Sequence, residues 1–286
     1  MKRTTRKKTK VIVVTATILI AACFTVLTAD KITEKDAQYI PDYLRIDLKS
    51  YTSIKAADFS DADYETLFRQ TGLGRDAVDS VFNSSEAPVE ALEAYQEAFF
   101  NPPAYTCYKI GIGSREESFL DGGGNAFSGF QIADVRVGDI VISKCTHSVG
   151  WRHGHAGIVI DAQKGKTFEA IYPGTVTMVQ NLSKWQTFPT FVLLRPKEPW
   201  TGEKAAAIAF EDLQGIYWRH YAGLFEKKGD SPRVTQCSHL IWYAYFQLGY
   251  DIDSDGLWPV TPKDIVNSEY FEVVQIFGVD PDRIWK

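Results

Sequence analysis

The segments HGHAGIVID (residues 153–161) and QCSHLIWYAYFQLG (residues 236–249) carry the most informative pattern of this chain. His155 stands at the head of a short apolar run that predicts a strand. Cys237 stands on the first turn of a predicted helix, directly after a polar segment. A thiol at a helix N-terminus is stabilised as thiolate by the positive end of the helix dipole. The two segments therefore predict a cysteine nucleophile with a histidine base.

Other histidines compete for the role of base. The chain contains His147, His153, His155, His220 and His239. His239 lies two residues after Cys237 on the same helix and should point elsewhere. His147 follows Cys145 closely, so these two residues form an alternative Cys–His pair. His153 shares the predicted face of His155, and this spacing suits a metal, but no further ligand pattern accompanies it. We expect His155 to be the base, because the rim of an apolar strand holds its ring still.

A third group usually orients the imidazole and stabilises its protonated form. Glu169, in KTFEAIY, lies on the next predicted strand and could face the same side as His155. Asp161 and Asp139 are alternatives, and spacing alone does not choose among the three carboxylates.

The central part of the chain reads as short, closely spaced strands. The β-rich runs are GDIVIS (138–143), HAGIVID (155–161), TFEAIY (167–172), VTMVQ (176–180), TFVLLR (190–195) and FEVVQIF (271–277). Most of the gaps between these runs are too short for crossover helices. An antiparallel sheet or half-barrel is therefore expected.

Helical patterns occur in the sequence both before the first of these runs and among the later ones. In the N-terminal half they cover SDADYETLFRQ, with Ser60 as cap, RDAVDSVF, and APVEALEAYQEAFF, with Pro88 in the first turn. In the C-terminal half they cover 202–213, the Cys237 segment and a short stretch from Pro262. Helices and an antiparallel sheet together predict an α+β fold.

The charge is unevenly distributed. Residues 1–10 contain six of the 31 Lys and Arg residues and no acid. The rest of the chain therefore has 25 basic against 36 acidic residues, a net charge of −11. A nucleic-acid partner is not expected, because phosphate contacts need clustered Lys and Arg.

The uncharged run VIVVTATILIAACFTVLTA (residues 11–29) follows this basic flank. It is about long enough to cross a bilayer, and the basic flank keeps the first residues cytoplasmic. Its layout also fits a secretory signal. Ile20 to Cys23 resembles a lipobox, with Cys23 as the lipidated residue, but the chain stays apolar beyond it. We expect an uncleaved membrane anchor, with the rest of the chain outside the cytoplasm.

Three cysteines lie beyond the anchor. If Cys237 stays a free thiol, Cys107 and Cys145 are left as a candidate disulfide in an oxidising compartment. The alternative is two structural cysteines that never meet.

The ordered series GDIVIS, GHAGIVID, TFEAIYPGTVTM, QCSHLIWYAYFQLGYDID and TPKDIVNS resembles the YaeF/YiiX group of permuted papain-like amidases. The resemblance covers roughly residues 130–275. It implies a circularly permuted papain-like (NlpC-type) fold, in which histidine precedes cysteine, the reverse of papain-like enzymes. It further implies Cys237 as nucleophile, His155 as base and Glu169 as orienting residue. Tyr217, in QGIYWRHY, matches the group's tyrosine upstream of the nucleophile and is expected to line the oxyanion site.

The expected function is that of an extracytoplasmic cysteine amidase or peptidase, a hydrolase that needs no metal or organic cofactor. The expected substrate is a cell-wall peptide or a lipid-like acyl amide. The alternatives are a thiol acyltransferase that uses the same Cys–His pair, and an inactive surface-binding module. The expected organisation is an anchor segment at 1–29, a helical accessory region at 30–103 and a catalytic domain at 104–286.

Overall fold

The computed structural model describes residues 38–111, 113–219, 232–257 and 259–285, together with the single residues Thr15, Thr25, Thr28, Lys31 and Thr33. Most of the expected anchor, including Cys23, lies outside these residues, and so does His220. In the part of the chain that is described, no helix is both long and apolar enough to cross a bilayer.

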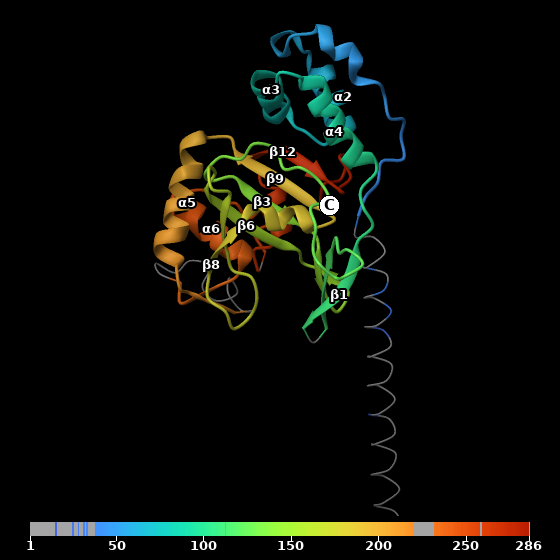
Figure 1. Ribbon diagram of the computed structural model, residues 1–286. Helices are drawn as coiled ribbons and strands as arrows, with labels where there is room; N and C mark the ends of the chain where they lie inside the picture. Colours follow the sequence, from blue (N-terminus) through green and yellow to red (C-terminus); the bar gives the residue numbers. More distant parts are fainter. Residues whose placement is uncertain are drawn as a thin grey trace, which may run out of the picture.

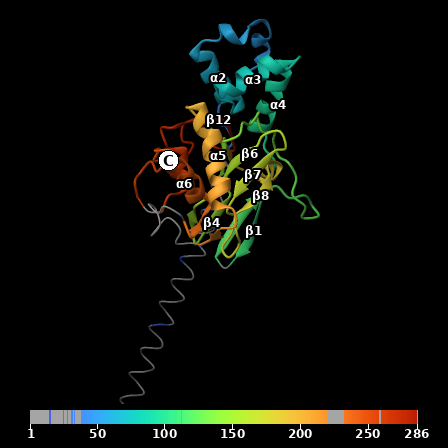
Figure 2. The ribbon, with the colours of Figure 1, turned by 90° about the vertical axis from the view of Figure 1, so that its left-hand side faces the viewer.

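The fold is α+β, with N-terminal helices and antiparallel sheets packed against helices (Figures 1 and 2). From Gln38 onward, the helices in the described residues are η1 (Leu48–Ser53), η2 (Ala56–Asp58), α2 (Asp61–Thr71), α3 (Arg75–Ser84), α4 (Pro88–Phe100), η3 (Leu182–Thr187), α5 (Pro199–Leu213), α6 (Cys237–Gln247) and α7 (Pro262–Val266), where η denotes a 3-10 helix. The predicted cap of α2 is confirmed. The Ser60 side chain accepts from the Asp63 N–H, and the Asp63 carboxylate accepts from the Ser60 N–H.

The main sheet has six strands in the order β12-β9-β3-β6-β7-β8, and every pairing is antiparallel. Its strands are β3 (Ile140–Ser143), β6 (His155–Asp161), β7 (Lys166–Glu169), β8 (Met178–Asn181), β9 (Phe191–Pro196) and β12 (Phe271–Phe277). The predicted antiparallel sheet is therefore confirmed. Several strand boundaries differ from the prediction by one to three residues, and two of these differences lie at one turn. The strand predicted at 167–172 ends at Glu169, and the one predicted at 176–180 begins at Met178, because the turn around Pro173 and Gly174 separates them.

Both faces of the main sheet are buried, because alternate residues of each strand point to opposite sides. One face packs with α5 and α6 through Ile140, Ile142, Ile158, Val192, Leu194 and Ile276. The other face packs with the N-terminal helices and with the Trp185 segment through Val141, Val159, Phe191, Leu193 and Phe277. The near-continuous apolar runs of these strands follow from this double burial.

The N-terminal helices α2, α3 and α4 gather at one end of the molecule, beside β12 (Figure 1). The link between α2 and α3 is the segment TGLG. The Gly74 N–H donates to the Val274 carbonyl at 2.8 Å, and the Ile276 N–H donates to the Gly72 carbonyl at 2.7 Å. A Cβ at Gly72 would lie 2.2 Å from the Ile276 carbonyl oxygen. This close backbone approach requires glycine and docks the helical region on the sheet.

A second sheet has the order β1-β2-β4-β5 and lies at the end of the molecule away from the N-terminal helices (Figures 1 and 2). Its strands are β1 (Thr106–Gly111), β2 (Ser114–Ser118), β4 (Thr146–Ser148) and β5 (Trp151–Arg152). A short parallel pair, β10 (Tyr217–Trp218) with β11 (Val234–Thr235), leads into α6.

Of the two alternatives for Cys107 and Cys145, the disulfide is wrong, because neither cysteine is in a disulfide. Strand β2 separates the two residues. Cys107 pairs with Glu117 on one side of β2, and the Glu117 N–H donates to the Cys145 carbonyl on the other side. Two strand spacings put their Cα atoms roughly 10 Å apart, which exceeds the span of about 7 Å that a disulfide allows.

Candidate active site

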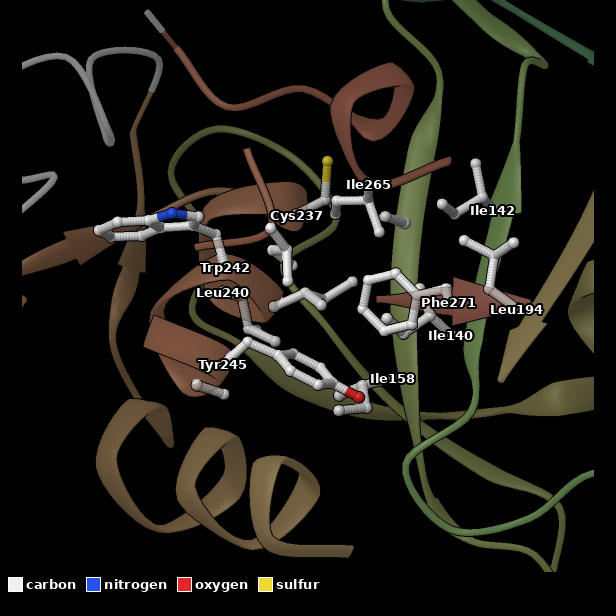
Figure 3. Packing of buried hydrophobic residues seen from close by; sticks show 14 of the residues in the cluster. Ile140, Ile142, Ile158, Leu194, Cys237, Leu240, Trp242, Tyr245, Ile265 and Phe271 are labelled. Atoms are coloured by element: carbon white, nitrogen blue, oxygen red, sulfur yellow. The ribbon is translucent and has the colours of Figure 1, made fainter. Parts of the chain in front are cut away.

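Cys237 is the first residue of α6, as the sequence predicts. Gln236 caps the helix: its side-chain oxygen accepts from the Ser238 N–H at 2.9 Å and from the Cys237 thiol at 3.4 Å. The Gln236 side-chain nitrogen donates to the Val260 carbonyl at 2.9 Å, which fixes the cap. Figure 3 shows Cys237 at the edge of the apolar cluster, with its sulfur directed away from Leu240 and Tyr245. Cys237 as a residue is 9% exposed and belongs to this buried cluster.

His155, the first residue of β6, is brought to Cys237. The two side chains lie close enough for each to shift the pKa of the other. His155 Nε2 lies 2.7 Å from Oε2 of Glu169, so Nδ1 is the ring nitrogen left for the sulfur. The imidazole also stacks on Trp185, with ring centroids 5.2 Å apart and an interplanar angle of 7°. The ring is therefore held on three sides.

Glu169 is fully buried at the end of β7 and is the carboxylate that faces His155. Its Oε1 atom accepts from the Thr167 hydroxyl at 2.6 Å and from the Trp185 indole N–H at 3.0 Å. Its Oε2 atom also accepts from Lys184 Nζ at 2.7 Å. These contacts fix the carboxylate and compensate its burial.

The register of β6 and β7 explains why His155 and Glu169 meet. Ile158 pairs with Phe168, so the same register places Gly157 opposite Glu169. His155 is then the diagonal neighbour of Glu169, and long side chains reach each other across such a diagonal. Gly157 lies between them, and a Cβ there would stand 2.9 Å from Cγ of Glu169. Glycine at this position therefore makes room for the carboxylate.

The electrostatics favour an ion pair between Cys237 and His155. Burial alone would lower the pKa of His155, but its hydrogen bonds with Cys237 and Glu169 outweigh burial and raise it to about 9. Burial alone would raise the pKa of Cys237, but the hydrogen bond and charge of His155 lower it below its usual value. The backbone N–H groups of Ala156 and Ser238 act in the same direction. Burial likewise opposes ionisation of Glu169, yet His155 and Lys184 lower its pKa to about 2.

The competing carboxylates lie elsewhere. Asp139 is buried against Arg195, with Nη2 2.6 Å from Oδ2. Asp161 accepts from the Lys164 N–H at 2.9 Å in the turn after β6. Of the three carboxylates that spacing left open, the structure brings only Glu169 to His155.

The other described histidines are engaged away from Cys237. His153 Nε2 lies 3.0 Å from the Ser148 hydroxyl, and His239 Nδ1 lies 3.1 Å from the Thr235 hydroxyl. His147 faces Cys107 rather than Cys145, with Nε2 3.7 Å from the Cys107 sulfur. The alternative pair of Cys145 with His147 is therefore not formed.

Tyr217 lies in β10, paired with Val234, three residues before Cys237. Its side chain is 51% exposed, and the Arg219 guanidinium lies 5.1 Å from its ring centroid. Among the described residues, the Tyr217 hydroxyl forms no hydrogen bond with Cys237 or His155. Tyr217 thus lies beside β11, the strand that precedes Cys237, and its hydroxyl does not contact the Cys237 side chain.

Comparisons with protein-family models, with curated proteins and with solved structures gave no match. Function is therefore inferred from the geometry of this site.

Sequence reasoning missed three residues that shape the site. Lys184 and Trp185 come from the η3 segment and hold Glu169, and Gln236 caps the nucleophile helix. The segment SKWQTF has no periodic signal that would connect it to the strand of Glu169. The polar residue directly before Cys237 was a readable signal, because a helix N-terminus needs a side-chain acceptor.

Proposed function

We propose that the chain is a cysteine hydrolase that cleaves amide bonds with Cys237 as nucleophile, His155 as base and Glu169 as orienting residue. The observation that carries the proposal is that His155 lies 2.7 Å from the buried Glu169 carboxylate and interacts electrostatically with the Cys237 sulfur. The charges of these groups favour thiolate and imidazolium. The order of these residues along the chain, together with the helix-and-sheet arrangement, supports a circularly permuted papain-like fold.

The reaction begins when the Cys237 thiolate attacks the carbonyl carbon of the amide. The resulting oxyanion is stabilised by the backbone N–H of Cys237 at the start of α6, which has no partner within the helix. One such donor is typically worth about 3 kcal/mol in the transition state. The imidazolium of His155 then gives its proton to the leaving nitrogen, and the C–N bond breaks.

The acyl group is then bound to Cys237 as a thioester, and His155 is neutral. Water loses a proton to His155 as its oxygen attacks the thioester carbonyl. The C–S bond breaks, and the sulfur leaves as thiolate. The acid product departs, and the thiolate–imidazolium pair is restored. Glu169 stays ionised throughout and stabilises the imidazolium.

The proposed substrate is a cell-wall peptide or a lipid-like acyl amide. We place the enzyme outside the cytoplasm, held at the membrane by residues 11–29. That segment is uncharged and follows six Lys and Arg residues. For an enzyme tethered outside the membrane, wall peptides are the nearest abundant amides.

The test uses the full chain in detergent, incubated with wall peptides and with N-acyl amines, and detects new amines by mass spectrometry. Cys237→Ala is the matched variant, since it removes only the sulfur. We expect amide cleavage and an acyl adduct on Cys237 in the parent protein and neither in the variant. Equal cleavage by both proteins would contradict the proposal. So would no cleavage together with no reaction of Cys237 with a thiol-directed probe.

A further inference from the structure

A second group of cysteine, histidine and glutamate side chains lies in the small sheet, away from the candidate active site. Cys107 is on β1, Glu117 on β2 and His147 on β4. Cys107 pairs directly with Glu117. Because Arg115 pairs with His147 on the other side of β2, His147 is a diagonal neighbour of Glu117. The register therefore brings three side chains from three strands to one face of the sheet.

The three ligand-type atoms converge. Nε2 of His147 lies 3.7 Å from Sγ of Cys107 and 3.3 Å from Oε1 of Glu117. The three atoms all lie within 4.8 Å of one another. A tetrahedral zinc ion with ordinary bond lengths holds sulfur and nitrogen about 3.6 Å apart, and nitrogen and oxygen about 3.3 Å apart. The two separations from Nε2 of His147 match these values without rearrangement.

The same ring nitrogen of His147 faces both the sulfur and the carboxylate. In a proton relay the two ring nitrogens have separate partners, as Nε2 of His155 has in Glu169. Convergence on one nitrogen is instead the arrangement of three ligands around a common centre. The cluster of Cys107, Glu117 and His147 is therefore not a second copy of the catalytic constellation.

Burial and charge fit a cation at this position. His147 and Glu117 are fully buried, and Cys107 is half-buried. Arg152 donates to both carboxylate oxygens of Glu117 at 2.9 Å, which fixes the orientation of the carboxylate. Outer contacts of this kind are typical of metal ligands. The thiolate and the carboxylate supply two negative charges, one of which the Arg152 cation already offsets.

We propose that Cys107, Glu117 and His147 bind one zinc-class divalent ion. Mixed sulfur, nitrogen and oxygen ligands suit zinc, whereas magnesium and calcium take oxygen ligands. On binding, the Cys107 thiol releases its proton to solvent and the sulfur forms the metal bond. The ion links β1, β2 and β4, so it stabilises the small sheet. Water completes the fourth position, on the accessible side of Cys107.

The test uses the full chain in detergent, reduced and stripped of metal with a chelator. Co²⁺ is then titrated and followed by absorption, because a thiolate ligand gives a charge-transfer band. We expect one Co²⁺ per chain, a thiolate band, and loss of the band when Zn²⁺ is added. Cys107→Ser should abolish the band, whereas Cys237→Ser, which removes the thiol at the start of α6, should retain it.

A second readout guards against misfolding of a variant. Zn²⁺ should raise the melting temperature of the Cys237→Ser protein and leave that of Cys107→Ser unchanged, because only the first binds the ion in its folded state. Absence of a thiolate band in the reduced parent protein would overturn the proposal. A band that disappears in Cys237→Ser and persists in Cys107→Ser would do so as well. Neither result bears on amide cleavage by Cys237.

Discussion

Nε2 of His155 lies 2.7 Å from Oε2 of Glu169, and the two residues are diagonal neighbours on antiparallel strands. This contact engages Nε2 of the imidazole with a buried carboxylate and leaves Nδ1 for the Cys237 sulfur. The contact also favours the protonated imidazole, because a carboxylate with a pKa of about 2 remains ionised beside the ring.

The first prediction concerns the pH dependence of amide hydrolysis. His155 has a raised pKa of about 9, so its imidazolium form is present below that pH and lost as pH rises through it. Hydrolysis needs the imidazolium as acid, so its rate should fall above about pH 9. Glu169→Gln removes the negative charge of Glu169, which helps to raise this pKa, while burial still lowers it and the interaction with Cys237 remains. The decline of the hydrolysis rate at high pH should therefore begin at a lower pH in Glu169→Gln.

The measurement is kcat/KM against pH for the parent protein and for Glu169→Gln. We expect kcat to fall about a hundredfold in Glu169→Gln. Lys184→Gln is the control, since it removes a different partner of the same carboxylate. A decline at high pH that stays in place in Glu169→Gln would contradict the role of Glu169.

The second prediction concerns the room beside Glu169. In Gly157→Ala the new Cβ would stand 2.9 Å from Cγ of Glu169 and 3.0 Å from Cζ2 of Trp185. Overpacking of this kind costs about 1–3 kcal/mol and should displace the carboxylate. We expect a lower melting temperature and a lower kcat.

The matched control is Gly122→Ala, where a Cβ meets nothing within 4 Å. That variant should melt and turn over like the parent protein. A Gly157→Ala protein with unchanged stability and rate would show that the close packing around Glu169 is not required.

The third prediction concerns Tyr217. If its hydroxyl stabilises the oxyanion, Tyr217→Phe should lower kcat about tenfold or more and leave KM nearly unchanged. The ring is half-exposed, so folding should not suffer. Unchanged kcat would remove Tyr217 from the site and leave the backbone of α6 as the source of oxyanion donors.

Much of the fold could be read from the sequence. The alternating and continuous apolar runs predicted the strands of the main sheet, and the cap at Ser60 and the proline at Pro88 marked helix starts. Local signals decide these features. Boundaries were less accurate where a turn shortens a strand, as it does after Glu169.

The contacts between distant segments were harder to foresee. Spacing left three carboxylates open as partners of His155, and only strand register distinguishes Glu169 from Asp161. The same reason hides the cluster of Cys107, Glu117 and His147, because its members come from three strands and share no sequence motif. The sequence instead suggested a disulfide for Cys107, and the intervening strand β2 rules it out.

The most direct test of the central claim is the rate at which iodoacetamide alkylates Cys237, measured against pH in the parent protein and in His155→Gln. Peptide mapping by mass spectrometry assigns the alkylated cysteine. If His155 lowers the pKa of Cys237, the parent should react about tenfold faster at neutral pH, and the rise in the variant should shift to higher pH. Superimposable profiles, or alkylation confined to other cysteines, would contradict the account.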